Sequence, residues 1–149
     1  MEAKEKLLRI KHIDTLIQNK TAEKNYWKAN MMELATCITP QMNGERVQSS
    51  GSKQKMADTV DSGIDRIRRM EKRIAELYAE MDAIIAIIDM LPEDKSDILH
   101  KVYVQYKSLK EVAALRGESY SWVTTNHGIA LKMFSDLLQK QETKATKSN

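Results

Sequence analysis

The stretch that decides the fold runs from Ser108 to Ser119 and reads SLKEVAALRGES. Ser108 and Glu111 form a capping box, in which the serine hydroxyl accepts a hydrogen bond from the backbone amide of Glu111 and the glutamate reaches back. This pattern predicts a short helix that begins at Leu109. Gly117 stands where a left-handed residue would end that helix, and Ser119 can cap the next one.

Helices are predicted on both sides of this stretch. Pro92 is followed by two acidic residues, which is typical of a helix start because proline is pre-shaped for the first turn and acids meet the positive end of the helix dipole. This helix should end near Lys107. After Ser119 an apolar face recurs at helical spacing as far as Leu138. Two helices joined by a short turn with glycine predict a helix-turn-helix over residues 92–140.

Two longer apolar stripes precede this segment, and both recur at steps of three and four residues. They predict helices over about residues 7–38 and 55–90. Because the two stripes are comparable and one loop joins them, the helices should form a long antiparallel coiled-coil hairpin within residues 1–91. Lys20 and Lys24 interrupt the first stripe, and we expect their aliphatic chains to pack across a neighbouring helix. The stripe members are Ile10, Ile13, Ile17, Trp27, Met31, Leu34 and Ile38, then Ile64, Ile67, Met70, Ile74, Leu77, Met81, Ile84, Ile88 and Leu91.

The predicted connection between the stripes, residues 39–54, has no periodicity. Loops of this length in compact proteins are either functional or disordered. Hydrogen-bond donors gather near the start of the second helix, where free amides and the dipole favour an anion. A phosphate contact and a solvated tip are both consistent with this pattern. The candidate residues are Arg46, Gln48, Ser49, Ser50, Lys53 and Lys55.

Five basic residues lie within residues 66–73. Asp65 stands four residues before Arg69, the spacing of an ion pair along one helix. Lys72 stands at the same distance before Glu76. We therefore expect this run to be a solvated flank of the coiled coil rather than a nucleic-acid patch.

The composition limits the class of protein. The chain has 149 residues, of which 42% are hydrophobic, and its two Pro and five Gly are too few for the turns of an all-β fold. The class is therefore all-α. The formal net charge of +3 permits a nucleic-acid partner without demanding one. A lone Cys37, the lack of a secretion signal and the lack of a long apolar run predict a cytoplasmic protein without a membrane partner.

The helix after Ser119 offers a face for DNA. A rotation of about 100° per residue places hydroxyl-bearing and small residues opposite the apolar side, where hydroxyls can meet base edges and glycine allows close approach. The predicted DNA-contacting residues are Tyr120, Ser121, Thr124, Thr125, Gly128 and Lys132, with Lys107, Lys110 and Arg116 contacting the phosphate backbone. Because the helix has no Lys or Arg before Lys132, we expect affinity to depend on dimerisation, on RNA polymerase or on the hairpin.

Other residue patterns favour packing over chemistry. Trp122 and His127 border the apolar face, where we expect them to pack rather than to stack on bases or to bind a metal. The sequence has no nucleophile with a paired base, no metal-spaced ligand cluster and no phosphate-cradling glycine loop. We expect a protein that is not an enzyme and needs no cofactor.

At Leu91-Pro92, EVAALRG (111–117), Ser119, Val123 and Ala130-Leu131 the sequence resembles the fourth conserved region of bacterial sigma factors, with the same spacing and without gaps. At GERVQSSG (44–51), KMAD (55–58), YSWV (120–123), His127-Gly128 and Ala130-Leu131 it resembles more closely a family of small sigma-factor-like regulators that are encoded by phages and prophages of Gram-positive bacteria. This second resemblance covers nearly the whole chain.

The resemblance implies a transcription regulator whose region 4-like helix-turn-helix binds double-stranded promoter DNA. Its hairpin would form a homo-oligomer or engage RNA polymerase or a sigma factor. An alternative function is an anti-sigma-like interaction module that acts on a sigma factor or polymerase without reading DNA, which the scarcity of cations favours. Another is the small subunit of a phage DNA-packaging machine, which would form a ring. The polar residues 141–149 are expected to fray.

Overall fold

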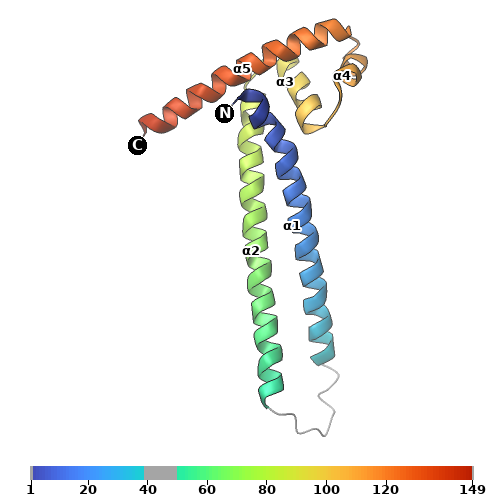
Figure 1. The fold of residues 1–149 in the computed structure, drawn as a ribbon, viewed down its shortest axis with the longest axis vertical. Helices are drawn as coiled ribbons and strands as arrows, with labels where there is room; N and C mark the ends of the chain where they lie inside the picture. The colour runs from blue at the N-terminus through green and yellow to red at the C-terminus, as the bar shows by residue number, and fades with distance from the viewer. Residues whose placement is uncertain (1, 39–49, 149) are drawn as a thin grey trace. The chain divides into compact units, whose positions relative to one another are not determined.

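The computed structural model describes residues 2–38 and 50–148, and it describes side chains over residues 2–33 and 58–148. These residues are helical apart from short connections, and no strand occurs among them, which confirms the all-α class. No helix of the described chain is both long and apolar enough to span a bilayer. The elements are α1 (Ala3–Ile38), α2 (Ser50–Asp89), α3 (Glu93–Leu99), the π-helix η2 (His100–Val104), α4 (Leu109–Arg116) and α5 (Tyr120–Lys147) (Figure 1).

The chain divides into two compact units. One joins Met1–Thr15 to Ala79–Asn149, and the other is Leu16–Tyr78. The division does not coincide with the boundary predicted at residue 91, because the first turns of α1 and the last turns of α2 belong with the C-terminal helices. We call these the C-terminal unit and the middle unit.

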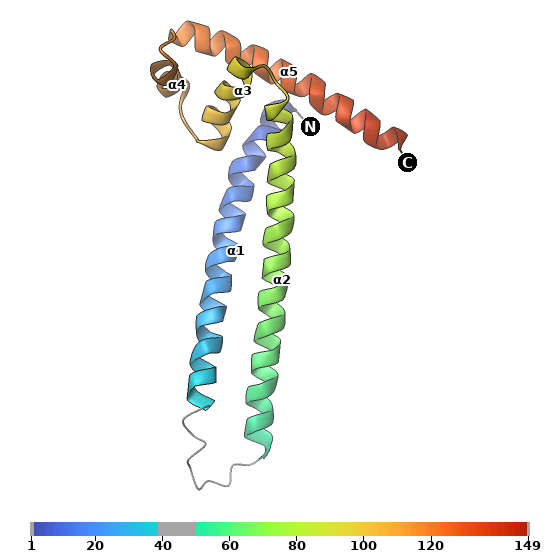
Figure 2. The same cartoon turned by 180° about the vertical axis from the view of Figure 1, so that it is seen from behind.

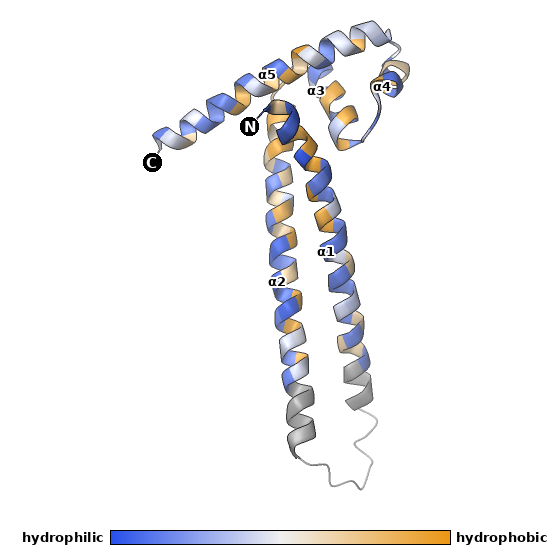
Figure 3. Ribbon diagram, in the orientation of Figure 1, coloured by the Kyte–Doolittle hydropathy of each residue, from blue (hydrophilic) through white to orange (hydrophobic). Residues whose placement is uncertain are grey.

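In the middle unit, α1 and α2 lie side by side, as both views show (Figures 1 and 2). Ile17, Met70 and Leu77 are buried between them, whereas hydrophilic residues predominate along α1 beyond Ile17 (Figure 3). Lys20 and Lys24 are partly buried, as the interrupted stripe predicts. The apolar contact between these helices is therefore discontinuous.

One member of the predicted stripe in α2 is wrong. Ile64 is 38% exposed, and the inward position belongs to the buried Gly63. A Cβ added at Gly63 would lie 2.5 Å from Sδ of Met31 in α1. The glycine therefore permits a close approach that a count of apolar residues cannot detect.

The predicted ion pairs of the basic run are also wrong. Within the described residues, Glu76 Oε2 lies 3.5 Å from Nη1 of Arg73 rather than beside Lys72, and no pair joins Asp65 to Arg69. Glu71 Oε1 instead lies 3.5 Å from Nζ of Lys28 in α1. Spacing along one helix cannot rank these partners, because i,i+3 and i,i+4 neighbours are both within reach and a second helix competes.

In the C-terminal unit, α3 and α4 both pack against α5 (Figures 1 and 2). The largest side chains in this unit that are almost wholly removed from solvent come from every α-helix of the unit and are apolar. They are Leu7, Ile10, Ile13, Ile84, Ile88, Ile98, Leu99, Val112, Val123 and Phe134.

Two helix ends differ from the predictions. Helix α2 begins at Ser50, so residues 50–54 of the predicted loop are helical. They include one glycine and no proline, and a single glycine costs a helix only about 1 kcal/mol. Helix α5 continues to Lys147, past the predicted end at residue 140. Lys144 and Lys147 in its last turn complement the negative end of the helix dipole.

The segment after α3 departs from the single helix predicted to end near Lys107. It becomes the π-helix η2, where the amide of Gln105 donates to the carbonyl of His100 at 2.9 Å. Tyr106 then adopts a φ of 59°, which is rare for a residue with a side chain. Its hydroxyl donates to Oδ2 of Asp14 at 3.0 Å. Burial and this carboxylate raise the pKa of Tyr106 to about 12.

Candidate nucleic-acid interface

The two helix starts around the turn are capped as the sequence predicts. The hydroxyl of Ser108 accepts from the amide of Glu111 at 3.2 Å, at the start of α4. The hydroxyl of Ser119 accepts from the amide of Trp122 at 3.0 Å, at the start of α5. Each cap satisfies an amide that the first turn of a helix leaves without a backbone partner.

Gly117 ends α4 in the left-handed conformation, with a φ of 67°. The amide of Glu118 donates to the carbonyl of Ala113 at 3.0 Å, and that of Gly117 donates to Ala114 at 3.4 Å. This pair of bonds is the Schellman arrangement, which requires a residue that tolerates a positive φ. Only residues 117–119 therefore separate the two helices.

A small apolar cluster fixes α4 and α5 on α3. Ile98, Val112, Ala113 and Val123 are buried together, with Val102, Leu109 and Trp122 packed against them. Trp122 is thus a packing residue, as predicted. The neighbouring Asn126 is 9% exposed, and its Nδ2 donates to the carbonyl of Trp122 at 2.9 Å. The inward side of α5 is accordingly occupied by packing.

The opposite side of α5 is open. All six residues predicted to contact DNA on this helix are exposed. The Oγ1 of Thr124 donates to the carbonyl of Tyr120 at 2.8 Å, so this hydroxyl offers a partner an acceptor rather than a donor. We call this surface the hydroxyl face; it consists of Tyr120, Ser121, Thr124, Thr125, Gly128 and Lys132.

Arg116 does not lie where the sequence predicts a phosphate contact. Its Nη1 bonds to Oδ2 of Asp97 in α3, and its guanidinium carbon lies 5.3 Å from the ring centroid of Trp122. Its Nε is buried without a hydrogen-bond partner among the described residues. The side chain therefore ties α4 to α3 and α5 rather than facing solvent.

Asp97 is the acceptor at the centre of this arrangement, because Lys101 Nζ bonds to its other oxygen. Burial opposes the negative charge of Asp97, but the hydrogen bonds and charges of Lys101 and Arg116 outweigh it and lower the pKa of the carboxyl group. The sequence patterns do not predict this cluster. Its only local signal is the i,i+4 spacing of Asp97 and Lys101, since Arg116 is 19 residues away.

The remaining predicted phosphate contacts are Lys107, which is partly buried, and Lys110, which is exposed. Glu111 and Glu118 are also exposed near them in sequence. With Arg116 bound to Asp97, this part of the chain presents few cations. Strong phosphate anchoring by this region alone is not supported.

His127 and Tyr103 form a second interaction that the sequence does not indicate. Their rings stack at 5.8 Å and 20°, and the tyrosine hydroxyl lies 3.0 Å from Nε2 of His127. Burial, with a smaller effect from the charge of Lys4, lowers the pKa of His127. His127 is therefore half-buried against an aromatic ring, in keeping with the predicted packing role.

Six further candidate phosphate contacts come from the predicted loop. Arg46, Gln48 and Ser49 fall outside the described residues. Ser50, Lys53 and Lys55 belong to the first turns of α2, but their side chains are outside the described part.

We compared the chain with known proteins in three ways. A scan against protein-family models, a search of curated proteins and a search of solved structures each found no match.

Proposed function

We propose that the chain is a phage-type, sigma-factor-like transcription regulator, in which α4 and α5 form a helix-turn-helix that binds promoter DNA. One observation carries the proposal: α4 ends at a left-handed Gly117, α5 restarts at the Ser119 cap, and the hydroxyl face of α5 is exposed. This is the geometry in which a second helix can enter a major groove by its N-terminal end.

The hydroxyl face suits base reading better than phosphate binding. Ser121 and Thr125 can donate to or accept from base edges, and a threonine methyl can meet the methyl of thymine. Gly128 allows the helix to approach the groove closely. Lys132 is the only Lys or Arg on this face, so the electrostatic part of the binding free energy is small and comes from elsewhere in the assembly.

The other parts of the chain supply that assembly. In this proposal α1 and α2 form a coiled-coil hairpin that dimerises or engages RNA polymerase or a sigma factor. The protein acts in the cytoplasm and is not an enzyme. Its contribution at a promoter is positioning.

A second candidate function is an interaction module that binds polymerase or a sigma factor without reading DNA. Three large apolar side chains around α4 and α5 support it, because protein interfaces favour aromatic and aliphatic anchors. Leu115 is 59% exposed, Tyr120 is 51% exposed and Ile129 is 44% exposed. Such residues are not required for contact with a phosphate backbone.

A matched pair of substitutions in α5 tests the proposal. Thr125→Glu places a carboxylate on the hydroxyl face, where it would repel phosphates and remove a hydroxyl. Thr143→Glu makes the same change at an exposed position of the same helix. Duplexes selected from a randomised DNA library by the wild-type protein serve as probe, with and without RNA polymerase, at two salt concentrations.

We expect the wild-type protein to shift the selected duplex, more weakly at the higher salt concentration. Thr125→Glu should abolish the shift, while Thr143→Glu should leave it in place and both variants should keep the wild-type circular dichroism spectrum. Equal binding by Thr125→Glu and the wild type would remove the hydroxyl face from the interface. Polymerase binding without any DNA shift would establish the second candidate.

A further inference from the structure

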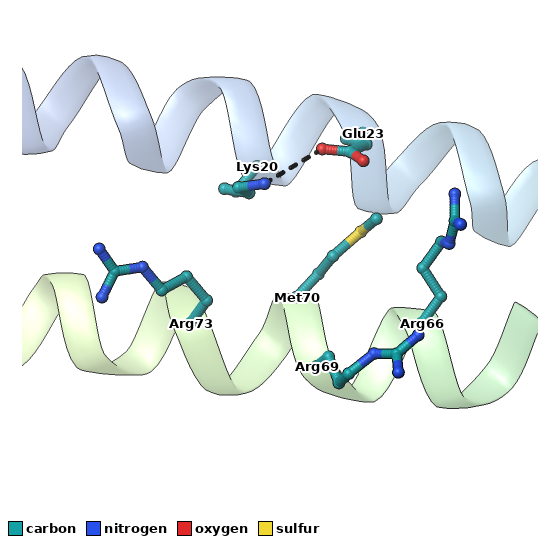
Figure 4. Close-up of a pocket in the computed structure, with 6 residues that line it drawn as sticks. All are labelled: Lys20, Glu23, Arg66, Arg69, Met70 and Arg73. Carbon is teal, nitrogen blue, oxygen red and sulfur yellow. Dashed lines mark ion pairs between the residues drawn. The ribbon is translucent and has the colours of Figure 1, made fainter.

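The middle unit contains an open pocket of about 240 Å³ between α1 and α2. Figure 4 shows that residues from both helices surround it and that the side chain of Met70 crosses between them. Its lining consists of Lys20, Glu23, Arg66, Arg69, Met70 and Arg73.

The charge of this lining is strongly one-sided. Four of the six residues are cationic and only Glu23 is a carboxylate, which leaves a surplus of three positive charges. The chain as a whole has a formal net charge of +3 at pH 7. A surplus equal to that of the entire chain is therefore concentrated in one small pocket.

The internal partners of these cations are weak or missing. Lys20 Nζ lies 3.5 Å from Glu23, and Arg73 Nη1 lies 3.5 Å from Glu76; both distances are long for charge-assisted hydrogen bonds. Arg66 lies over the ring of Trp27, 4.6 Å from its centroid. Within the described residues, no ion pair is formed by Arg69.

This concentration of charge is unfavourable for the hairpin by itself. Arg66, Arg69 and Arg73 follow one another at spacings of three and four on α2, where like charges destabilise a helix. Alternating positive and negative charges would stabilise a solvent-exposed helix surface better.

We propose that this pocket binds phosphate groups. Guanidinium forks match the geometry of phosphate oxygens. Arg69 and Arg73 are the principal ligands, each for a separate phosphate group, because their side chains extend in opposite directions along α2 (Figure 4). Lys20 adds a point charge when it leaves Glu23, and Arg66 stays on the ring of Trp27. The basic run of α2 is then a binding surface rather than the solvated flank predicted from spacing.

The phosphate groups can come from a nucleic-acid backbone or from a small polyphosphate. Both present the same oxygens to the pocket. The proposal goes beyond the proposed function, which places DNA on the hydroxyl face of α5. It requires no contact between the two surfaces.

Two probes and a matched pair of variants test the pocket in the full chain. Inorganic tripolyphosphate is titrated by calorimetry, and a mixed-sequence DNA duplex is titrated by fluorescence anisotropy. Arg69→Gln removes a cation of the lining. Arg68→Gln removes a neighbouring exposed cation that does not line the pocket, so both variants have the same net charge.

We expect Arg69→Gln to weaken binding of at least one probe about tenfold, the effect of losing a hydrogen bond to a charged group. Arg68→Gln should bind as the wild type does. Dependence of the duplex alone on Arg69 identifies nucleic acid as the source of phosphate, and dependence of tripolyphosphate identifies a small anion. Equal losses in both variants, or no binding of either probe by the wild type, would overturn the proposal.

Glu23→Gln gives an independent test in the opposite direction. It removes the only carboxylate of the lining and should tighten binding of the probe that responds to Arg69. Weaker binding by this variant would contradict the proposal. Thr125→Glu, which tests the hydroxyl face, should leave tripolyphosphate binding unchanged, so failure of one proposal is distinguishable from failure of the other.

Discussion

The C-terminal unit and the middle unit bury their residues in different ways. In the first, short helices pack on α5 and leave Ile98, Val112 and Val123 at 0% exposure. In the second, two long helices lie side by side, and charged side chains line the space between them near the buried Met70. A closed apolar core fixes the shape of one unit, whereas the other keeps a polar seam that a ligand can reach.

Matched leucine truncations should give the largest difference between the units. Leu99→Ala in α3 should cost about 4 kcal/mol and Leu77→Ala in α2 about 2 kcal/mol, within the range of such truncations. Both leucines are almost fully buried, but the two-helix seam can close on a void more easily than a core with several walls. Urea unfolding, with hydrogen exchange to assign the loss to each unit, measures both. Equal costs would show that the middle unit packs as rigidly as the C-terminal unit.

Substitutions in ion pairs should give a smaller difference between the two units in the loss of unfolding free energy. Asp97→Asn should cost about 2 kcal/mol, because it leaves the Arg116 guanidinium partly buried without its carboxylate. Glu76→Gln should change stability by less than about 0.5 kcal/mol, since the side chains of Arg73 and Glu76 are 50% and 52% exposed. The same urea experiment measures both variants. A cost for Glu76→Gln as large as that for Asp97→Asn would contradict this ranking.

The Asp97 pair also predicts a dependence on pH. The folded state lowers the pKa of this carboxyl group below its ordinary value of 3.8. Asp97 therefore contributes its full stabilisation at pH values above its pKa in the unfolded chain. This stabilisation is lost as the pH falls through the lower pKa of the folded state. The stability difference between the wild type and Asp97→Asn should shrink in that acidic range.

Substitutions of two glycines should give the smallest difference in stability between the units. Gly117→Ala should cost about 1 kcal/mol, because a side chain is disfavoured at a φ of 67°. Gly63→Ala should change stability by less than about 0.5 kcal/mol, since the gain in helix propensity offsets the displacement of the flexible end of Met31. Thermal unfolding of both variants measures the effect. A large loss for Gly63→Ala would mean that the seam cannot adjust.

Local patterns predict much of this fold. The caps at Ser108 and Ser119 and the left-handed Gly117 follow from hydrogen bonding and sterics within a few residues, and all three are present. The apolar spacing of α1 and α2 likewise predicts two helices. The hydroxyl face follows from the same periodicity, because exposure of one side is implied when the other side is apolar.

The errors arise where distant residues compete. The role of Arg116 depends on Asp97 and Trp122, which reach it from α3 and α5. The inward position of Gly63 depends on Met31 in the other helix, and Glu71 pairs with Lys28 across the same seam. Neither spacing nor composition contains these contacts. The sequence does not predict the basic pocket for the same reason, since Lys20 joins the arginines of α2 only when the two helices meet.

The π-helix η2 has a consequence for how this chain can change over evolution. A π turn holds about one residue more than an α turn, so it is equivalent to a single-residue insertion within a helix. Removing one residue from His100–Val104 would restore regular α winding, change the directions of the remaining side chains in that turn and keep the residues on either side in register. Tyr103 would then lose its place beside His127. Deletion of a single residue is thus enough to change the direction of an aromatic side chain, while the identity of every residue on either side is unchanged.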